Sequence, residues 1–154
     1  MNSPLDLIAQ PDALVLDLRA ANGVEAVRAL HARLGTAAGA VADPTRLLVE
    51  VGERMNVASV CIAEDIALPH ARTTAVSRTV LAIGRALGEV AFDAEHPRVK
   101  LVFLIGTPKE AVTEYLKFVA ALSRWLKSPP TRAALLAAPG EQEFRALLVR
   151  AAQR

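Results

Sequence analysis

The sequence is poor in cysteine, in aromatic residues and in long apolar runs, and each shortage excludes a class of protein. Cys61 is the single cysteine, which excludes a disulfide framework and a cysteine-rich metal site. Aromatic residues make up 4% of the 154 residues, so we expect an aliphatic core. No apolar run approaches the ~18–20 residues of a membrane span, and the N-terminus lacks the basic start of a signal peptide. We therefore expect a cytoplasmic protein without membrane insertion.

The charge and the glycine pattern exclude further classes. The net charge is only +2, although seven lysine or arginine residues and two glutamates lie between residues 117 and 154. These basic residues are spaced out, which favours a solvated helix face over nucleic-acid binding. No P-loop and no glycine-rich dinucleotide motif occurs. We therefore expect neither a nucleic-acid partner nor a cofactor.

Helical and strand-like segments alternate along the chain. The patterns predict helices over 22–34, from Asp43 through residue 51, and over 110–127, 131–137 and 141–153, with Gly35 ending the first and the prolines at 129 and 130 ending the third. Strands are predicted over 13–18, 79–87 and 99–105, with the last ("VKLVFLIG") central and buried on both faces. This order predicts one domain over residues 1–154, of the α/β class, with helices packed on both faces of a mixed sheet.

The chain has three histidines, and one of them has an unusual setting. His31 lies within a predicted helix and His96 in a polar turn, and neither has metal ligands near it in the sequence, so no metal site is expected. His70 follows Pro69 in "IALPHAR". Because proline fixes its own φ and biases the preceding residue to an extended conformation, we expect His70 on a stiff segment at the edge or end of the sheet. From the residues alone, a structural histidine and a reactive one both remain open.

A nucleophile built from Ser59, Cys61 and His70 is another possibility. The sequence offers no glycine-rich elbow and no supporting acid at a motif spacing. A covalent cysteine enzyme is therefore disfavoured.

"IALPHAR" resembles the active-site segment of phosphotransferase-system enzyme IIA domains of type 2, the fructose, mannitol and nitrogen-regulatory group. The similarity extends over nearly the whole chain and includes "LVLDL", "VEAVRALHARL", "DPTRLLVEVGER", "VFLIGTP" and "YLKFVAALSRWL". It implies the fold of that family, a mixed sheet between helices. It also implies that a histidine accepts a phosphoryl group from the phosphocarrier HPr and passes it to a IIB domain or signals by it.

The resemblance assigns roles to particular residues. His70 matches the phosphoryl acceptor, and Arg54 in "GERM" matches an arginine whose planar fork suits a phosphoryl group. Arg72 is close enough in sequence to screen the phosphoryl charge. Two plainer interpretations remain: Arg54 satisfies carbonyls at a helix end, and Arg72 points to water.

The approach to the histidine departs from the family pattern. Where relatives have "STGIGNGIAIPH", this chain has "ASVCIAEDIALPH", with Cys61, Ala63 and Asp65 in place of glycines and with Glu64 added. If these carboxylates lie near His70, they repel a bound phosphoryl group. Alternatively, Asp65 accepts a hydrogen bond from His70 and fixes its tautomer.

The long C-terminal helix departs as well. Tyr115 stands where many relatives have a second histidine. Its hydroxyl can donate to an oxyanion without bringing positive charge, or its ring can simply pack at the edge of the core. Two functions therefore remain: a IIA-like phosphohistidine carrier or regulator, with an HPr-like donor and a IIB-like or regulated target as separate proteins, and a binding module that keeps the fold without phosphorylation.

Overall fold

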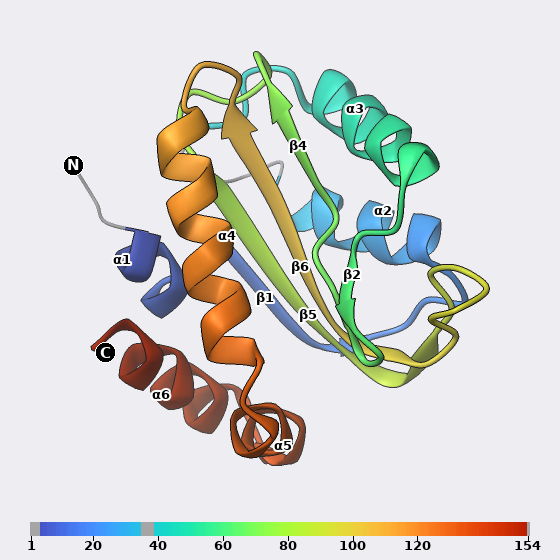
Figure 1. Cartoon of the computed structure of the whole chain (residues 1–154), viewed down its shortest axis with the longest axis vertical. Helices are drawn as coiled ribbons and strands as arrows, with labels where there is room; N and C mark the ends of the chain where they lie inside the picture. Colours follow the sequence, from blue (N-terminus) through green and yellow to red (C-terminus); the bar gives the residue numbers. More distant parts are fainter. Residues whose placement is uncertain (1–3, 35–38, 154) are drawn as a thin grey trace.

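The computed structural model describes residues 4–34 and 39–153 and has helices on both faces of a six-stranded mixed sheet (Figure 1), which confirms the predicted α/β class. The strands are β1 (Ala13–Leu18), β2 (Cys61–Ala63), β3 (Ile66–Ala67), β4 (His70–Thr73), β5 (Val80–Val90) and β6 (Val99–Pro108). The helices are α1 (Pro4–Ala9), α2 (Gly23–Leu34), α3 (Pro44–Val57), α4 (Val112–Leu126), α5 (Pro129–Ala137) and α6 (Glu141–Ala152).

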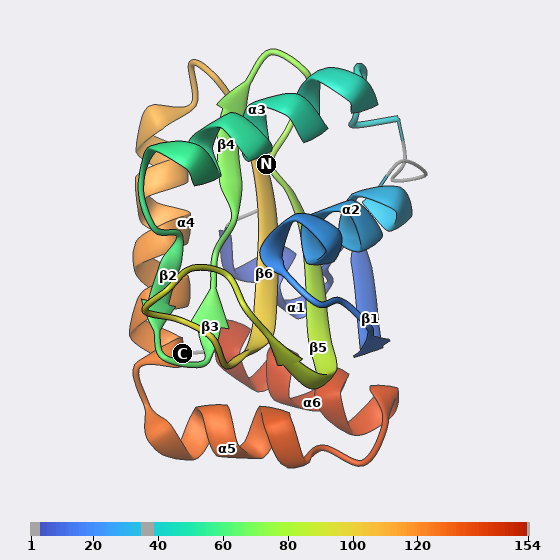
Figure 2. The same ribbon diagram turned by 90° about the vertical axis from the view of Figure 1, so that its right-hand side faces the viewer.

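The sheet has the order β1-β5-β6-β3-β2, and β4 also pairs with β6. β5 runs antiparallel to β6, whereas β3 and β4 both run parallel to it, one after the other along the same side (Figure 2). Ile66 lies opposite Leu101 and His70 lies opposite Ile105. Between them Pro69 donates no hydrogen bond, but its carbonyl accepts one from Ile105 N at 2.9 Å. The edge of the sheet therefore continues past the proline into the strand that begins with His70.

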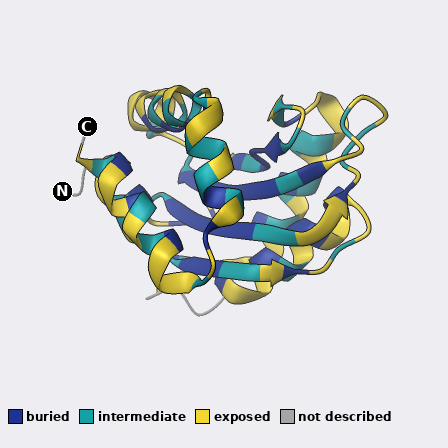
Figure 3. Cartoon of the chain, turned by 90° about the horizontal axis from the view of Figure 1, so that it is seen from below, coloured by how far each residue is buried: buried dark blue, intermediate teal, exposed yellow. Residues whose placement is uncertain are grey.

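β6 is the central strand, and nearly all its side chains are buried, as predicted. Alternate residues point to opposite faces: Val102 and Leu104 pack with α2 and α3, and Phe103 and Ile105 pack with α1, α4, α5 and α6. Figure 3 shows buried residues along the strands and exposed residues on the outer sides of the helices. The two apolar layers hold α3 and α4 on opposite faces of the sheet.

All five predicted helices are present, with differences in detail. α3 begins as expected, with Asp43 accepting a hydrogen bond from Arg46 N and Pro44 in the first turn. α5 begins at Pro129 and not at Thr131, because Ser128 caps it. The first N–H groups of a helix have no acceptor within the helix, so a proline, which lacks an N–H, fits there. α1 was not predicted at all. The expected helix end at Gly35 lies outside the described residues.

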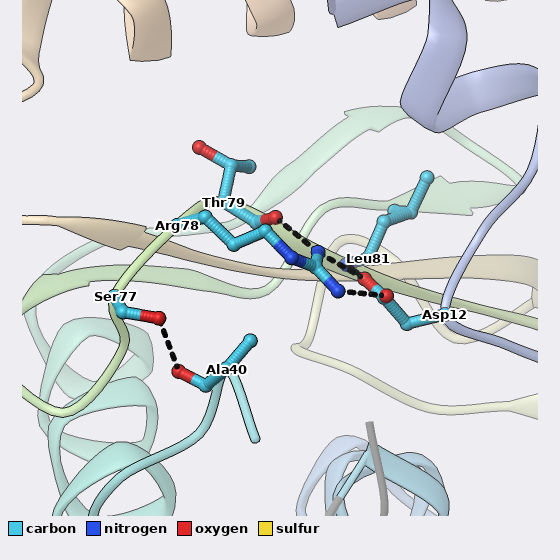
Figure 4. Close-up of polar contacts among 6 residues, drawn as sticks. All are labelled: Asp12, Ala40, Ser77, Arg78, Thr79 and Leu81. Carbon is cyan, nitrogen blue, oxygen red and sulfur yellow. Dashed lines mark hydrogen bonds and ion pairs between the residues drawn. The ribbon is translucent and has the colours of Figure 1, made fainter. Parts of the chain in front are cut away.

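A bidentate ion pair fastens the outer strand β1 to β5 (Figure 4). Arg78 donates to both carboxylate oxygens of Asp12, at 2.8 and 3.3 Å, and Leu81 N donates to the same carboxylate at 2.9 Å. Asp12 thus connects the start of β1 to the start of β5.

Among the helices of the described residues, none has both the length and the apolar character needed to cross a membrane.

Candidate functional site at the edge of the sheet

An open pocket of about 610 Å³ lies at the sheet edge formed by β4 and is lined from α3 on one side and from α4 on the other. Its lining residues come from four segments and are Glu50, Glu53, Arg54, Val57, His70, Ala71, Arg72, Lys109, Val112, Tyr115 and Leu116. His70, Arg54, Arg72 and Tyr115, which the sequence had singled out, are therefore brought together around one cavity.

The ring of His70 is half-buried, and its orientation is fixed by the backbone. Nδ1 donates a hydrogen bond to the carbonyl oxygen of Leu68 at 2.7 Å. Because a carbonyl oxygen can only accept, Nδ1 carries the proton and the neutral ring has its lone pair on Nε2. The tautomer of His70 is thus set by the Leu68 carbonyl and not by Asp65, which was one of the two alternatives for that residue.

The surroundings of His70 keep its ring neutral. Burial lowers the pKa of His70 below its ordinary value, the hydrogen bond to Leu68 opposes this, and the positive charge of Arg54 adds to the lowering. The ring of Tyr115 lies 5.5 Å from that of His70, centroid to centroid, with a tilt of 37°. Burial also raises the pKa of Tyr115, so its phenol remains a hydrogen-bond donor. A neutral imidazole with a free nitrogen is a nucleophile at neutral pH.

Three cations line the pocket, two expected and one not. Arg54 donates to the carbonyl of Ala58 at 3.0 Å, just beyond the end of α3. Arg54 therefore also satisfies a carbonyl at the helix end, which was the plainer interpretation of this residue. In the described part of the chain, no carboxylate lies within ion-pair distance of Arg54 or Arg72. Lys109 was missed by the sequence analysis. It directly follows β6, and its N–H donates to Thr73 O at 3.1 Å, which holds the backbone of Lys109 against the end of β4.

Two acids also line the pocket, Glu50 and Glu53. Glu50 accepts a hydrogen bond from the buried hydroxyl of Thr73 at 2.5 Å, which ties α3 to β4. The formal charge of the lining is therefore positive by one, three cations against two acids. Such a cavity is suited to a small anion held by directed donors.

Glu64 and Asp65 lie elsewhere. They form the turn between β2 and β3, and neither lines the pocket. Asp65 is paired with Arg132 of α5, Oδ1 to Nε, at 3.5 Å. The register on β6 separates Asp65 from His70 by more than four residues, roughly 13 Å or more at about 3.3 Å per residue. The structure thus places these carboxylates away from the histidine, so they neither orient it nor repel its ligand at close range.

Ser59, Cys61 and Ala63 also lie outside this pocket. Ser59 donates its hydroxyl hydrogen to Asp93 and not toward a reactive thiol. Burial raises the pKa of Cys61 to about 11, which leaves the thiol protonated at neutral pH. The arrangement of Ser59 and Cys61 with His70 as nucleophile and base therefore has no geometric support.

The comparisons with known proteins decide the family. The model of the phosphoenolpyruvate-dependent sugar phosphotransferase system, EIIA 2, matches residues 8–151. The chain belongs to this family. It is 34% identical over 116 residues to the PTS system fructose-specific EIIA component of Haloferax volcanii, covering 75% of each chain.

Solved structures agree with the family in fold. The nitrogen regulatory protein IIA-Ntr from Neisseria meningitidis has a TM-score of 0.80 at 21% identity, covering 92% of this chain and 99% of that one. The mannitol enzyme IIA of Escherichia coli, in complex with phosphorylated enzyme IIB, has a TM-score of 0.74 at 19% identity, covering 90% of this chain and 95% of that one. These likenesses confirm the architecture of a type 2 EIIA domain.

Proposed function

We propose that this EIIA domain accepts a phosphoryl group on Nε2 of His70 from an HPr-like phosphocarrier and passes it to a IIB-like partner or signals by it. The observation that carries the proposal is the hydrogen bond from Nδ1 to Leu68 O, because it reserves Nε2 as the nucleophile. Nε2 attacks the phosphorus as the bond from phosphorus to the donor breaks, and the electron pair of that bond returns to the donor. The product is a phosphohistidine on this chain.

The cations of the pocket support this transfer. Phosphoryl transfer has a transition state whose charge is spread over three equatorial oxygens, so positioned donors supply most of the catalysis. Arg54 and Arg72 offer guanidinium forks, Lys109 offers a third cation, and the phenol of Tyr115 offers a neutral donor. These four groups would stabilise the charge on the phosphoryl oxygens, whereas the free ring nitrogen supplies the attacking electron pair.

The rim of the pocket suits a protein partner. Val57, Val112 and Leu116 are exposed apolar side chains, with 80%, 41% and 60% of their surface accessible. Exposed apolar side chains of this kind are what a protein partner buries in an interface. The mannitol relative was solved with its phosphorylated IIB partner, and we propose that a IIB-like protein docks on this same rim.

A second candidate function is a binding module that keeps the partner surface without phosphorylation. Tyr115 in place of a second histidine, together with Glu50 and Glu53 in the lining, favours it. A phosphoryl group in this pocket faces two carboxylates and lacks the extra imidazole.

The test is phosphoryl uptake from phospho-HPr, followed by intact mass. We expect one acid-labile phosphoryl group per wild-type chain, none on His70→Ala, and full uptake by the matched control His31→Ala, whose ring contacts the carbonyl of Pro44 on the outer surface. Uptake that persists in His70→Ala would show that another residue is the acceptor. No uptake by a folded wild-type chain that still binds a IIB-like partner would favour the binding module.

A further inference from the structure

A second group of reactive side chains lies where β2 meets the connection between β5 and β6. Cys61, Asp93 and His96 each present one potential metal-ligand atom, and these atoms all lie within 4.8 Å of one another. The connection between β5 and β6 crosses in front of β2 and β3 in Figure 2. His96, which has no metal-ligand motif around it in the sequence, thus has two side chains with potential ligand atoms beside it in space.

Asp93 and His96 are held by a tight turn. Phe92 N donates to His96 O at 3.0 Å, and His96 N donates to Asp93 O at 3.1 Å. Within the turn, Nδ1 of His96 donates to Oδ1 of Asp93 at 2.7 Å. The two side chains are thus set side by side by the backbone before any ligand is present.

Ser59 joins this turn to the strand that carries the thiol. Its hydroxyl donates to Oδ2 of Asp93 at 2.8 Å and accepts from Cys61 N at 3.2 Å. A hydrogen bond to a carboxylate ligand from outside the site orients that ligand, as the outer partners of metal centres do. Ser59 therefore fixes the carboxylate and the start of β2 relative to each other.

We propose that Cys61, Asp93 and His96 form a binding site for a zinc-like divalent transition-metal ion. Thiolate, imidazole and carboxylate are the ligands that Zn²⁺ takes, whereas Mg²⁺ and Ca²⁺ prefer oxygen alone. Ligand atoms around a tetrahedral Zn²⁺ lie roughly 3.5 Å apart, so separations of up to 4.8 Å must close by about 1 Å, whereas the 2.7 Å hydrogen bond between Nδ1 of His96 and Oδ1 of Asp93 must open. Binding releases the thiol proton, and any proton on the ligating ring nitrogen, to solvent.

The site also has room for a fourth ligand. A cavity of about 500 Å³ lies beside it and is lined by Ser59, Asp93 and His96 among others. In zinc sites with three protein ligands, a water molecule or another ligand takes the fourth position. The half-buried side chains and the adjacent cavity give an ion a path from solvent.

The experiment is a Zn²⁺ titration of the purified full chain in competition with a chromogenic chelator. We expect one Zn²⁺ per chain, with affinity lowered at least about tenfold in Cys61→Ser and in His96→Gln and unchanged in the matched control His31→Gln. Co²⁺ in place of Zn²⁺ should give a thiolate charge-transfer band in wild type and none in Cys61→Ser. Equal Zn²⁺ affinity of wild type and Cys61→Ser, or no binding by the folded wild type, would overturn the proposal.

Thiol protection supplies a readout that needs no cysteine variant. Because Cys61 is the single cysteine, maleimide labelling followed by intact mass reports on it alone. Zn²⁺ should slow labelling of wild type and of His31→Gln, and should slow it far less in His96→Gln. A labelling rate that Zn²⁺ leaves unchanged in wild type would contradict the assignment of Cys61 as a ligand.

Discussion

The pockets beside His70 and beside His96 have one lining residue in common, and their two histidines have neighbours of opposite charge. Val57, at the end of α3, lines both. His70 donates from Nδ1 to a backbone carbonyl and has arginine and lysine side chains around it, whereas His96 donates from Nδ1 to a carboxylate and lies beside a thiol. Under the two proposals, the same side chain is suited to a phosphoryl anion at one site and to a metal cation at the other. The partner of Nδ1 and the charge of the neighbours decide which ligand a histidine suits.

The largest expected effect on phosphoryl uptake comes from removing a cation beside His70. Arg54→Gln should lower the initial rate of uptake from phospho-HPr by about 100-fold, or ~2.7 kcal/mol, because the variant loses both charge and fork. Arg54→Lys should fall between, since it keeps the charge without the planar fork. Zn²⁺ affinity should not change in either variant, because Arg54 does not contribute a ligand to the second site.

Arg46→Gln is the matched control for this measurement. Arg46 lies on the same helix, but it is paired with Asp43 at 3.5 Å and does not line the His70 pocket. Its uptake rate should equal that of wild type. If Arg54→Gln transfers as fast as Arg46→Gln, then Arg54 serves only the carbonyl of Ala58. A thermal unfolding curve for each variant shows whether a lower uptake rate comes from loss of the fold.

The second effect is a pH dependence caused by burial. Because the pKa of His70 is lowered, its ring stays neutral at neutral pH, and uptake should fall only as pH drops through a midpoint below about 6.5, the ordinary value for histidine. Tyr115→Ala removes a ring that covers His70, so the midpoint should rise toward the ordinary value.

The measurement is the uptake rate across pH 5 to 8 with the donor's own titration subtracted. Tyr115→Phe keeps the covering ring and loses only the hydroxyl, so its midpoint should remain near that of wild type. A midpoint that moves equally in Tyr115→Phe and Tyr115→Ala would mean that the hydroxyl, and not the burial, sets the pKa of His70.

The sequence predicted one of the two pockets because its signal is local. "IALPHAR" joins a proline and a histidine within a few residues, and the family resemblance added Arg54. Lys109 was missed because it reaches the pocket only through the parallel pairing of β4 with β6, and the sequence of the four-residue strand β4 does not specify this register. Ser59 and Asp93 are 34 positions apart, so only tertiary structure brings the second group together.

Local signals in the sequence also explain which helix and strand boundaries were predicted correctly and which were not. The alternating pattern of 13–18 and the apolar run of β6 predicted their strands, and Asp43 with Pro44 predicted the start of α3. Pro129 is ambiguous in sequence, because a proline both stops one helix and fits the first turn of the next. The capping hydroxyl of Ser128 resolves this ambiguity in favour of a new helix.

The smallest expected effect belongs to Glu64 and Asp65, the carboxylates of the turn between β2 and β3. Asp65→Asn should change uptake by less than about twofold, because roughly 13 Å exceeds the ~8 Å screening length at physiological salt. The substitution should lower the free energy of unfolding by at most about 1 kcal/mol, since the pair with Arg132 is partly exposed, at 24% and 23%. Urea denaturation of Asp65→Asn and of Arg132→Gln measures this loss, and the double variant should lose less than the two single losses added together. Glu64→Gln, which lies in the same turn, serves as the matched control for uptake. A tenfold rise in uptake in Asp65→Asn, with uptake by Glu64→Gln unchanged, would show that the Asp65 carboxylate acts on His70 from a distance. It would then be wrong that the immediate neighbours of a histidine alone decide which ligand it suits.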